Sequence, residues 1–193
     1  MDPATVQVYE HRATEWIARR GEATDGLGVR FRELSGEGPV ADLGCGAGRY
    51  FAEIGGHLIG MDATSAMLAL AQRRDRPLVR GDLEVLPFKS GTLAGVFARN
   101  SYVHLAKERV RPALAEALRV LRPGGVLFAT LIEGDYEGHE LPGDDFTGRF
   151  FACWQEAELT SVLESLGFVF VSTEVTGRPG ANARGLIATA RRS

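Results

Sequence analysis

Glycines and a carboxylate alternate in one short segment of the sequence. Asp42, Gly44, Gly46 and Gly48 stand at every second position at the end of the apolar run Val40–Leu43. Glycine has no Cβ, so a glycine-rich backbone can approach a ligand closely. In α/β sheets such a turn lies at the crevice where ligands bind. The segment therefore predicts a ligand-holding loop, although a tight strand-to-helix turn without a ligand would use the same residues.

Two further carboxylates end the next apolar runs. Asp62 follows the run His57–Met61, and Asp82 follows Leu78–Arg80 after one glycine. Asp62 could accept hydrogen bonds from both hydroxyls of a ribose, and Asp82 could accept one from an exocyclic amine. Met67 could cover a base, although a lone methionine is more often core and Asp62 alone could cap a helix. No single structural role explains why an acid stands at the end of each of three successive apolar runs. Together the three acids predict a nucleoside pocket.

These residues must be positioned by strands that alternate with helices. Five strands are expected first, at Val40–Leu43, His57–Met61, Leu78–Arg80, Leu93–Arg99 and Val126–Leu131, and two more at Phe168–Val175 and Leu186–Ala190. Helices are expected at about 5–20, 25–34, 49–54, 65–71, 107–121 and 155–166. This alternation indicates a parallel sheet with helices on both faces.

Length and composition limit the possibilities further. The chain has 193 residues, 45% hydrophobic residues and a net charge of −3, which suits one globular domain and does not favour a nucleic-acid partner. Cys45 and Cys153 are the only cysteines, so neither a disulfide framework nor a thiolate metal site is expected. No bound metal is expected for this reason. The sequence offers no apolar leader and no membrane segment, so we expect no membrane partner and a cytoplasmic location.

The glycine spacing separates two classes of cofactor. A dinucleotide fingerprint requires G-x-G-x-x-G, but Arg49 stands where its third glycine would be, which disfavours NAD. The sequence instead resembles the class I S-adenosylmethionine-dependent methyltransferases, particularly the methyltransferase type 11 domains. The resemblance rests on VADLGCGAGRY, LIGMDATSAMLALAQ, VRGDLEVLPF and RVLRPGGVLFATL, with GRFFACWQEAELTSVLESLGF later. It departs at Thr92–Gly95, where the family usually has an acid.

This resemblance implies a fold, a cofactor and site residues. The fold would be α/β, a Rossmann-like doubly wound, mostly parallel seven-stranded sheet with an antiparallel last strand. S-adenosyl-L-methionine would be the cofactor and S-adenosyl-L-homocysteine its product. The residues implied to contact the cofactor are Asp42, Gly44, Cys45, Gly46, Gly48, Asp62, Ala63, Met67, Asp82, Leu83 and Asn100.

We expect residues 1–193 to form one methyltransferase domain with four parts. They are an N-terminal helical cap (1–38), a cofactor-binding core (39–132), a lid or substrate segment (133–154), and a C-terminal helix and strands (155–193). The acids between Glu133 and Asp145 are not interrupted by lysine or arginine, so a lid made from them would repel phosphates, whereas a solvated loop is the alternative.

The acceptor is expected to be a small molecule, with methyl transfer by in-line displacement. RNA or protein methylation and a non-catalytic binding module of the same fold are the alternatives. His104 could be the base for a hydroxyl acceptor, or it could order its loop. Substrate contacts are expected from Tyr9, Trp16, Tyr102 and Trp154, although both tryptophans could be core. The chain could be a monomer or a homodimer.

Overall fold

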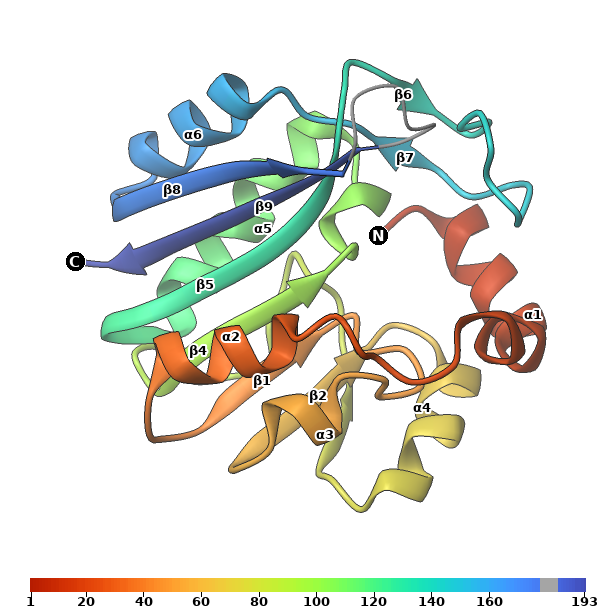
Figure 1. Ribbon diagram of the computed structural model, residues 1–193, viewed down its shortest axis with the longest axis horizontal. Coiled ribbons are helices and arrows are strands. Elements are labelled where there is room, and N and C mark those ends of the chain that lie inside the picture. The colour runs from red at the N-terminus through yellow and green to blue at the C-terminus, as the bar shows by residue number, and fades with distance from the viewer. Residues whose placement is uncertain (178–183) are drawn as a thin grey trace.

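A seven-stranded sheet forms the centre of the molecule (Figure 1). The computed structural model describes residues 1–177 and 184–193. The strands of this sheet are β1 (Val40–Leu43), β2 (Leu58–Asp62), β3 (Leu78–Arg80), β4 (Leu93–Arg99), β5 (Leu121–Glu133), β8 (Phe168–Thr176) and β9 (Arg184–Arg192). Their order across the sheet is β3-β2-β1-β4-β5-β9-β8, so the expected doubly wound sheet is confirmed.

The direction of the strands defines where a ligand can bind. Strands β1 to β5 pair in parallel, whereas β9 is antiparallel to both β5 and β8. The last strand of the chain is therefore the antiparallel one, and it lies inside the sheet. The strand order reverses between β1 and β4, and such switch points leave a crevice at the carboxyl ends of the strands.

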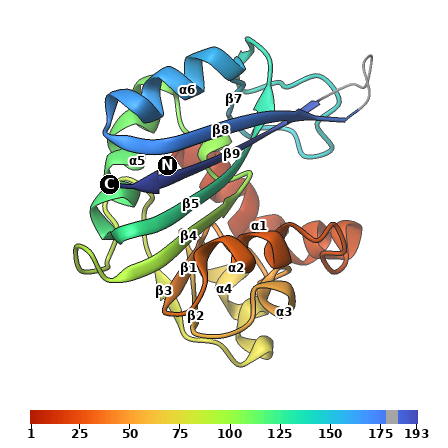
Figure 2. The ribbon, with the colours of Figure 1, turned by 60° about the vertical axis from the view of Figure 1, so that its left-hand side comes forward.

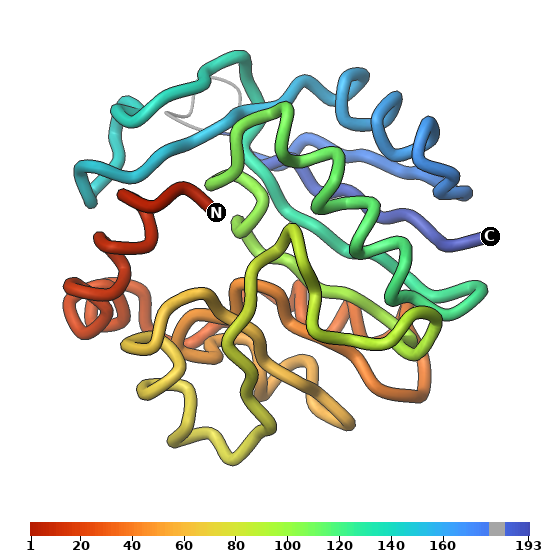
Figure 3. Tube along the Cα trace, turned by 180° about the vertical axis from the view of Figure 1, so that it is seen from behind, coloured from red at the N-terminus to blue at the C-terminus, as the bar shows by residue number. Residues whose placement is uncertain are grey.

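Helices cover both faces of the sheet (Figure 2). They are α1 (Pro3–Arg20), α2 (Leu27–Ser35), α3 (Phe51–Ile54), α4 (Ser65–Ala71), α5 (Lys107–Val120) and α6 (Glu156–Ser165), with short 3-10 helices at Gln72–Arg74 and Tyr102–His104. On one face, Phe31 of α2 and Phe51 of α3 pack with Phe97 and Phe128 of the sheet. On the other, α5 and α6 lie against the sheet, as the view from behind shows (Figure 3), and they bury apolar residues there.

The helix α1 lies at the open end of the sheet, beside the segment that contains β6 and β7 (Figure 1). The Asp2 side chain caps it by accepting a 2.8 Å hydrogen bond from the Thr5 amide, and Gly21 ends it with a φ of 59°. Its dihedral angles leave the helical range at Arg12, where the helix kinks. No helix in the described ranges is both long and apolar enough to cross a membrane.

Three elements differ from the sequence expectation. The helix expected at 49–54 is only the single turn α3, because residues 46–50 form turns. Strand β5 is much longer than Val126–Leu131, since it pairs with β9 as far as Glu133 and begins at Leu121, which pairs with Leu93 of β4. A small antiparallel sheet, β6 (Glu137–Gly138) with β7 (Phe151–Ala152), was not predicted, because two-residue strands carry no recognisable pattern.

Candidate functional site

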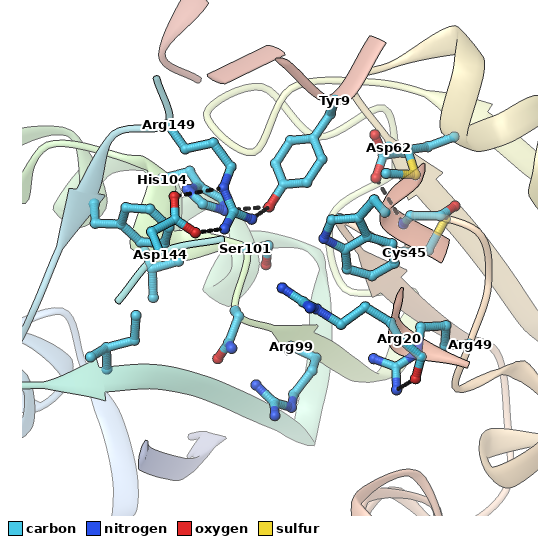
Figure 4. Close-up of a pocket in the computed structure, with 18 of the residues that line it drawn as sticks. Tyr9, Arg20, Cys45, Arg49, Asp62, Arg99, Ser101, His104, Asp144 and Arg149 are labelled. Atoms are coloured by element: carbon cyan, nitrogen blue, oxygen red, sulfur yellow. Dashed lines mark hydrogen bonds and ion pairs between the residues drawn. The ribbon is translucent and has the colours of Figure 1, made fainter. Parts of the chain in front are cut away.

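A cavity of about 370 Å³ opens at the carboxyl ends of β1, β2 and β4. Helix α1 and the segment 141–149 contribute its outer wall. Ten of the residues expected from the sequence line it: Tyr9, Trp16, Asp42, Gly44, Cys45, Gly46, Asp62, Met67, Asn100 and His104. The crevice expected at the strand ends therefore exists, and residues far apart in the sequence meet in it (Figure 4).

Four residues that the resemblance linked to the cofactor do not line the cavity. Gly48 packs against the Phe51 ring and Arg74, and Leu83 is buried in the core. The Ala63 carbonyl accepts a hydrogen bond from Arg80. The Asp82 carboxylate accepts a 2.9 Å hydrogen bond from the Met1 amino group.

Tyr102 and Trp154 were expected to touch a substrate, and the structure corrects this. Both are buried in the main hydrophobic core, with exposed fractions of 0% and 2%. Neither lines the cavity. Tyr102 lies in a 3-10 turn, and its side chain points towards α5 and α6. His104, two residues later, reaches the site. Spacing alone could not separate these two directions.

The glycine loop is shaped by close approach to the residue after β4. Gly44 has a φ of +72°, and a Cβ there would lie 2.5 Å from the Ser101 Cβ. Gly46 has a φ of +55°, but a Cβ there would meet only Met67 and Trp16, each at 3.9 Å. Gly44 is therefore required by packing, whereas Gly46 leaves open space inside the cavity.

Asp62 organises the loop that faces it. One carboxylate oxygen accepts a 2.8 Å hydrogen bond from the Gly46 amide. The other accepts bonds of 2.9 and 2.7 Å from the Thr64 amide and hydroxyl. Burial raises the pKa of Asp62, and these hydrogen bonds act in the opposite direction. The side chain thus fixes the start of α4 to the glycine loop and still borders the cavity.

Asp42 lies in the same part of the cavity with no hydrogen bond to its side chain from residues 1–177 or 184–193. It is 2% exposed. Burial, together with repulsion from Asp62, raises its pKa to about 8. Such a carboxyl group is poised to pair with a positively charged ligand.

We expect the Asp42→Asn variant to lose part of the pH dependence of stability. Between the ordinary carboxyl pKa of 3.8 and about 8, the folded protein keeps a proton on Asp42 that the unfolded chain releases. The free energy of unfolding of the wild type therefore falls as pH rises towards 8, by at most about 1.4 kcal/mol per pH unit. Urea titrations at pH 5.5 and 8 should show a smaller fall for Asp42→Asn, and equal falls would contradict the assignment.

His104 has hydrogen-bond partners at both ring nitrogens. Its Nδ1 lies 2.7 Å from the Phe150 carbonyl oxygen, which can only accept, so this nitrogen carries the proton. Its Nε2 therefore accepts the hydrogen bond from the Tyr9 hydroxyl at 2.9 Å. Arg149 donates to the Tyr9 oxygen at 2.7 Å. Burial lowers the pKa of His104 to about 4, so the imidazole is neutral at pH 7.

The segment 141–149 is held to α1 by ion pairs and aromatic contacts. Arg20 binds both oxygens of Asp145 at 2.7 Å, and Arg149 pairs with the buried Asp144. The ring of Phe146, fully buried, lies under the guanidinium groups of Arg12, Arg19 and Arg149. The expectation that this acidic segment would repel phosphates is wrong for the acids at the cavity, because arginines neutralise them.

The arginines of the cavity were not predicted from the sequence. Arg20, Arg49, Arg99 and Arg149 all line it. Arg99 ends β4 directly before Asn100, and alternation along that strand would have placed it on the face of Phe97. The other three had no comparable signal, since arginines are spread along the whole chain.

Comparison with known proteins places this geometry in a family. A family model described as "Methyltransferase domain" matches residues 41–129. The malonyl-[acyl-carrier protein] O-methyltransferase of Pectobacterium atrosepticum is 36% identical over 123 residues, which cover 58% of this chain and 47% of that protein. A mouse tRNA (carboxymethyluridine(34)-5-O)-methyltransferase is 27% identical over 138 residues, which cover 69% of this chain and 21% of that protein.

Solved structures share the whole fold. A Thermotoga maritima protein described as a SAM-dependent methyltransferase, possible histamine N-methyltransferase, superposes with a TM-score of 0.74 and 17% identity, covering 98% of this chain and 100% of that one. This chain spans about half the length of the malonyl relative, 47%. The matched domain contains the glycine loop, Asp62 and β4, which form the inner part of the cavity, whereas α1 and the segment 141–149 of the outer wall lie outside the match. Residues 41–129 therefore match the methyltransferase domain family, and the chain has the fold of solved S-adenosylmethionine-dependent methyltransferases.

Proposed function

We propose that this protein transfers the methyl group of S-adenosylmethionine to a small-molecule acceptor. The observation that carries the proposal is a single cavity that joins the glycine loop and two acids to Tyr9 and His104 on its other side (Figure 4). The first group has the chemistry to hold the cofactor, and the second has the chemistry to orient an acceptor. Residues 1–38 and 133–154 would act as the cap and lid of a core formed by 39–132.

The cavity fits the charge and shape of this cofactor. Its sulfonium and amino groups are positively charged, and the Asp42 carboxyl group has no partner in the described residues. The buried Ser101 hydroxyl also lacks a partner there. The space beside Gly46 would be filled by a Cβ at any other residue. We assign Asp42 and Gly46 to the methionine part, Asp62 to the ribose, and Met67 to the adenosine.

Methyl transfer from this cofactor requires mainly positioning. Bound S-adenosylmethionine supplies an already activated methyl group, so the protein must align an acceptor atom with it. Tyr9 faces the cavity with its oxygen held by Arg149 and His104. We assign Tyr9 to orientation of the acceptor and His104 to positioning of Tyr9, since neither His104 nitrogen is left free.

Replacing Tyr9 by Phe should slow methyl transfer without weakening cofactor binding. The variant keeps the ring but removes the oxygen that would contact the acceptor, and we expect kcat/KM to fall by about tenfold or more. The His104→Gln variant should show a smaller loss that appears mainly in KM. Affinity for S-adenosylhomocysteine should stay within about twofold of the wild type in both variants. A tenfold loss of that affinity would assign the pair to the cofactor instead.

The wall that covers part of the site favours a small acceptor. The wall formed by α1 and 141–149 is fastened by the Arg20–Asp145 and Arg149–Asp144 pairs, and the partly open cavity behind it has a volume of about 370 Å³. A folded RNA would need an open groove with exposed cations. RNA remains the second candidate because a curated relative is described as a tRNA methyltransferase.

Radiolabelled S-adenosylmethionine would test this proposal. The purified protein should label one or more members of a panel of small hydroxyl, amine and carboxyl compounds, and it should not label bulk tRNA or acyl-carrier protein without a small acyl group. Labelling of tRNA alone would overturn the small-molecule proposal. Absence of labelling by the protein, beside an active control methyltransferase, would support a binding module.

A further inference from the structure

The four arginines of the cavity differ in their partners. Arg20 pairs with Asp145, and Arg149 pairs with Asp144. Neither Arg49 nor Arg99 has a carboxylate within 4 Å in residues 1–177 and 184–193. Arg49 donates instead to the carbonyl oxygens of Gly21 and Arg20 at the end of α1, at 2.6 and 3.1 Å. Carbonyls at a helix C-terminus carry partial negative charge, so they partly offset the charge of Arg49. Arg99 donates to no carbonyl or carboxylate oxygen in the described residues.

Arg99 is held in place by two hydroxyl groups. Its Nε donates to the Tyr50 oxygen and its Nη1 donates to the Thr130 Oγ1, both at 3.2 Å. The Tyr50 hydroxyl donates its own proton to Asp25, and the Thr130 hydroxyl donates its proton to the Asn100 Oδ1, both at 2.8 Å. Each hydroxyl therefore accepts one hydrogen bond from Arg99 and donates its proton to another oxygen. These contacts fix the guanidinium without neutralising its charge.

The fixed guanidinium borders the cavity on the side away from Asp62 (Figure 4). Strand alternation places Arg99 on the same face of the sheet as Phe97, and its partner Thr130 lies on the neighbouring strand β5. Asp62 ends β2, two strands away in the opposite direction. Arginine binds carboxylates and phosphates through parallel N–H donors. A half-buried arginine with no counter-charge nearby is suited to receive one from a ligand.

We propose that Arg99 binds an anionic group, a carboxylate or a phosphate, on the methyl acceptor. This inference rests on the proposed function and specifies its substrate class: small molecules that carry an acidic group and present their nucleophile towards the cofactor. The alternative source of the anion is the carboxylate of the cofactor itself. The acceptor is favoured because Arg99 lies on the β5 side of the crevice, whereas the glycine loop and Asp62 lie on the β1 and β2 side.

Titration of the protein saturated with S-adenosylhomocysteine would test this inference. Malonate and inorganic phosphate serve as the anionic probes, and malonamide serves as the neutral control, with binding followed by NMR line broadening of the probe. The wild type should bind one or both anions saturably and should not bind malonamide. Arg99→Met should weaken anion binding by about tenfold or more. Arg76→Met, which removes an arginine outside the cavity, should match the wild type.

Three results would overturn the inference, and a second variant guards against misfolding of the first. Absence of saturable binding by the wild type, or equal binding by Arg99→Met, would show that Arg99 is no anion site. If Arg99→Met weakened S-adenosylhomocysteine but not 5′-methylthioadenosine, which lacks the carboxylate, Arg99 would serve the cofactor. Arg99→Lys keeps the charge and should bind the anions with intermediate affinity, and it replaces the methionine variant if that one does not fold.

The same titrations separate this inference from the proposed function. If the wild type did not bind S-adenosylhomocysteine, the proposed function would fail. The anion titrations repeated without the nucleoside would then still compare wild type with Arg99→Met. If anions then bound saturably and this binding depended on Arg99, Arg99 would still be an anion site. Only the conclusion that the anion belongs to a methyl acceptor would be lost.

Discussion

The Asp62→Ala variant should lose affinity for S-adenosylhomocysteine by about 100-fold or more. Removal of the carboxylate eliminates the group assigned to the ribose and also releases the Gly46 amide that shapes the loop. Hydrogen bonds to a charged group contribute about 1.5–3 kcal/mol each, and about 2.7 kcal/mol corresponds to 100-fold in affinity. Isothermal titration calorimetry would measure the loss.

The Asp62→Asn variant separates binding from folding. Its Oδ1 can still accept both hydrogen bonds from Thr64, so its free energy of unfolding should stay closer to that of the wild type than that of Asp62→Ala. Its amide nitrogen cannot accept from the Gly46 amide or from a second ribose hydroxyl, and affinity should therefore still fall. Wild-type affinity in the alanine variant would contradict the assignment of Asp62.

Gly44→Ala should destabilise the protein far more than Gly46→Ala. Both residues have positive φ, which costs a non-glycine residue about 1–2 kcal/mol. Only at position 44 would the added Cβ also overlap another atom, the Ser101 Cβ at 2.5 Å. We expect the free energy of unfolding to fall by about 3 kcal/mol or more for Gly44→Ala and by about 1 kcal/mol for Gly46→Ala.

Per folded molecule, Gly46→Ala should weaken cofactor binding more than Gly44→Ala does, which is the reverse of their order in stability. The Cβ of Gly46→Ala enters the cavity between Met67 and Trp16, so this variant should fold and bind S-adenosylhomocysteine at least about tenfold more weakly. The double variant Gly44→Ala with Ser101→Gly removes the overlap and should recover most of the lost stability. Urea denaturation and calorimetry would measure these effects, and a Gly46→Ala variant with full affinity would place the cofactor elsewhere.

The fold could be predicted because each element leaves a local pattern. Buried strands such as Leu93–Arg99 are continuous apolar runs, and α5 repeats its apolar residues at helical spacing. The acids at strand ends were predictable for the same reason, since parallel strands bring their carboxyl ends together. Strands β6 and β7 have only two residues each, which is too few to show an apolar run or an alternation.

The rest of the site depends on packing between distant segments. That Tyr9 meets His104 and Arg149 results from how α1 folds over residues 141–149, more than a hundred residues away. Tyr102 and Trp154 were expected at the substrate, yet both turn into the core. A single aromatic residue in a loop carries no periodic signal that would show which way its side chain points.

The most direct test of the central claim is a calorimetric titration of the wild type with S-adenosylmethionine and S-adenosylhomocysteine, with NAD as the control. If the cavity holds S-adenosylmethionine, both sulfur nucleosides should bind saturably, with dissociation constants of the order of micromolar, and NAD should not bind. This assignment is the basis of the stability prediction as well. It also predicts that a concentration 100 times the dissociation constant raises the free energy of unfolding by about 2.7 kcal/mol. Failure to bind either sulfur nucleoside, or binding of NAD in their place, would contradict it.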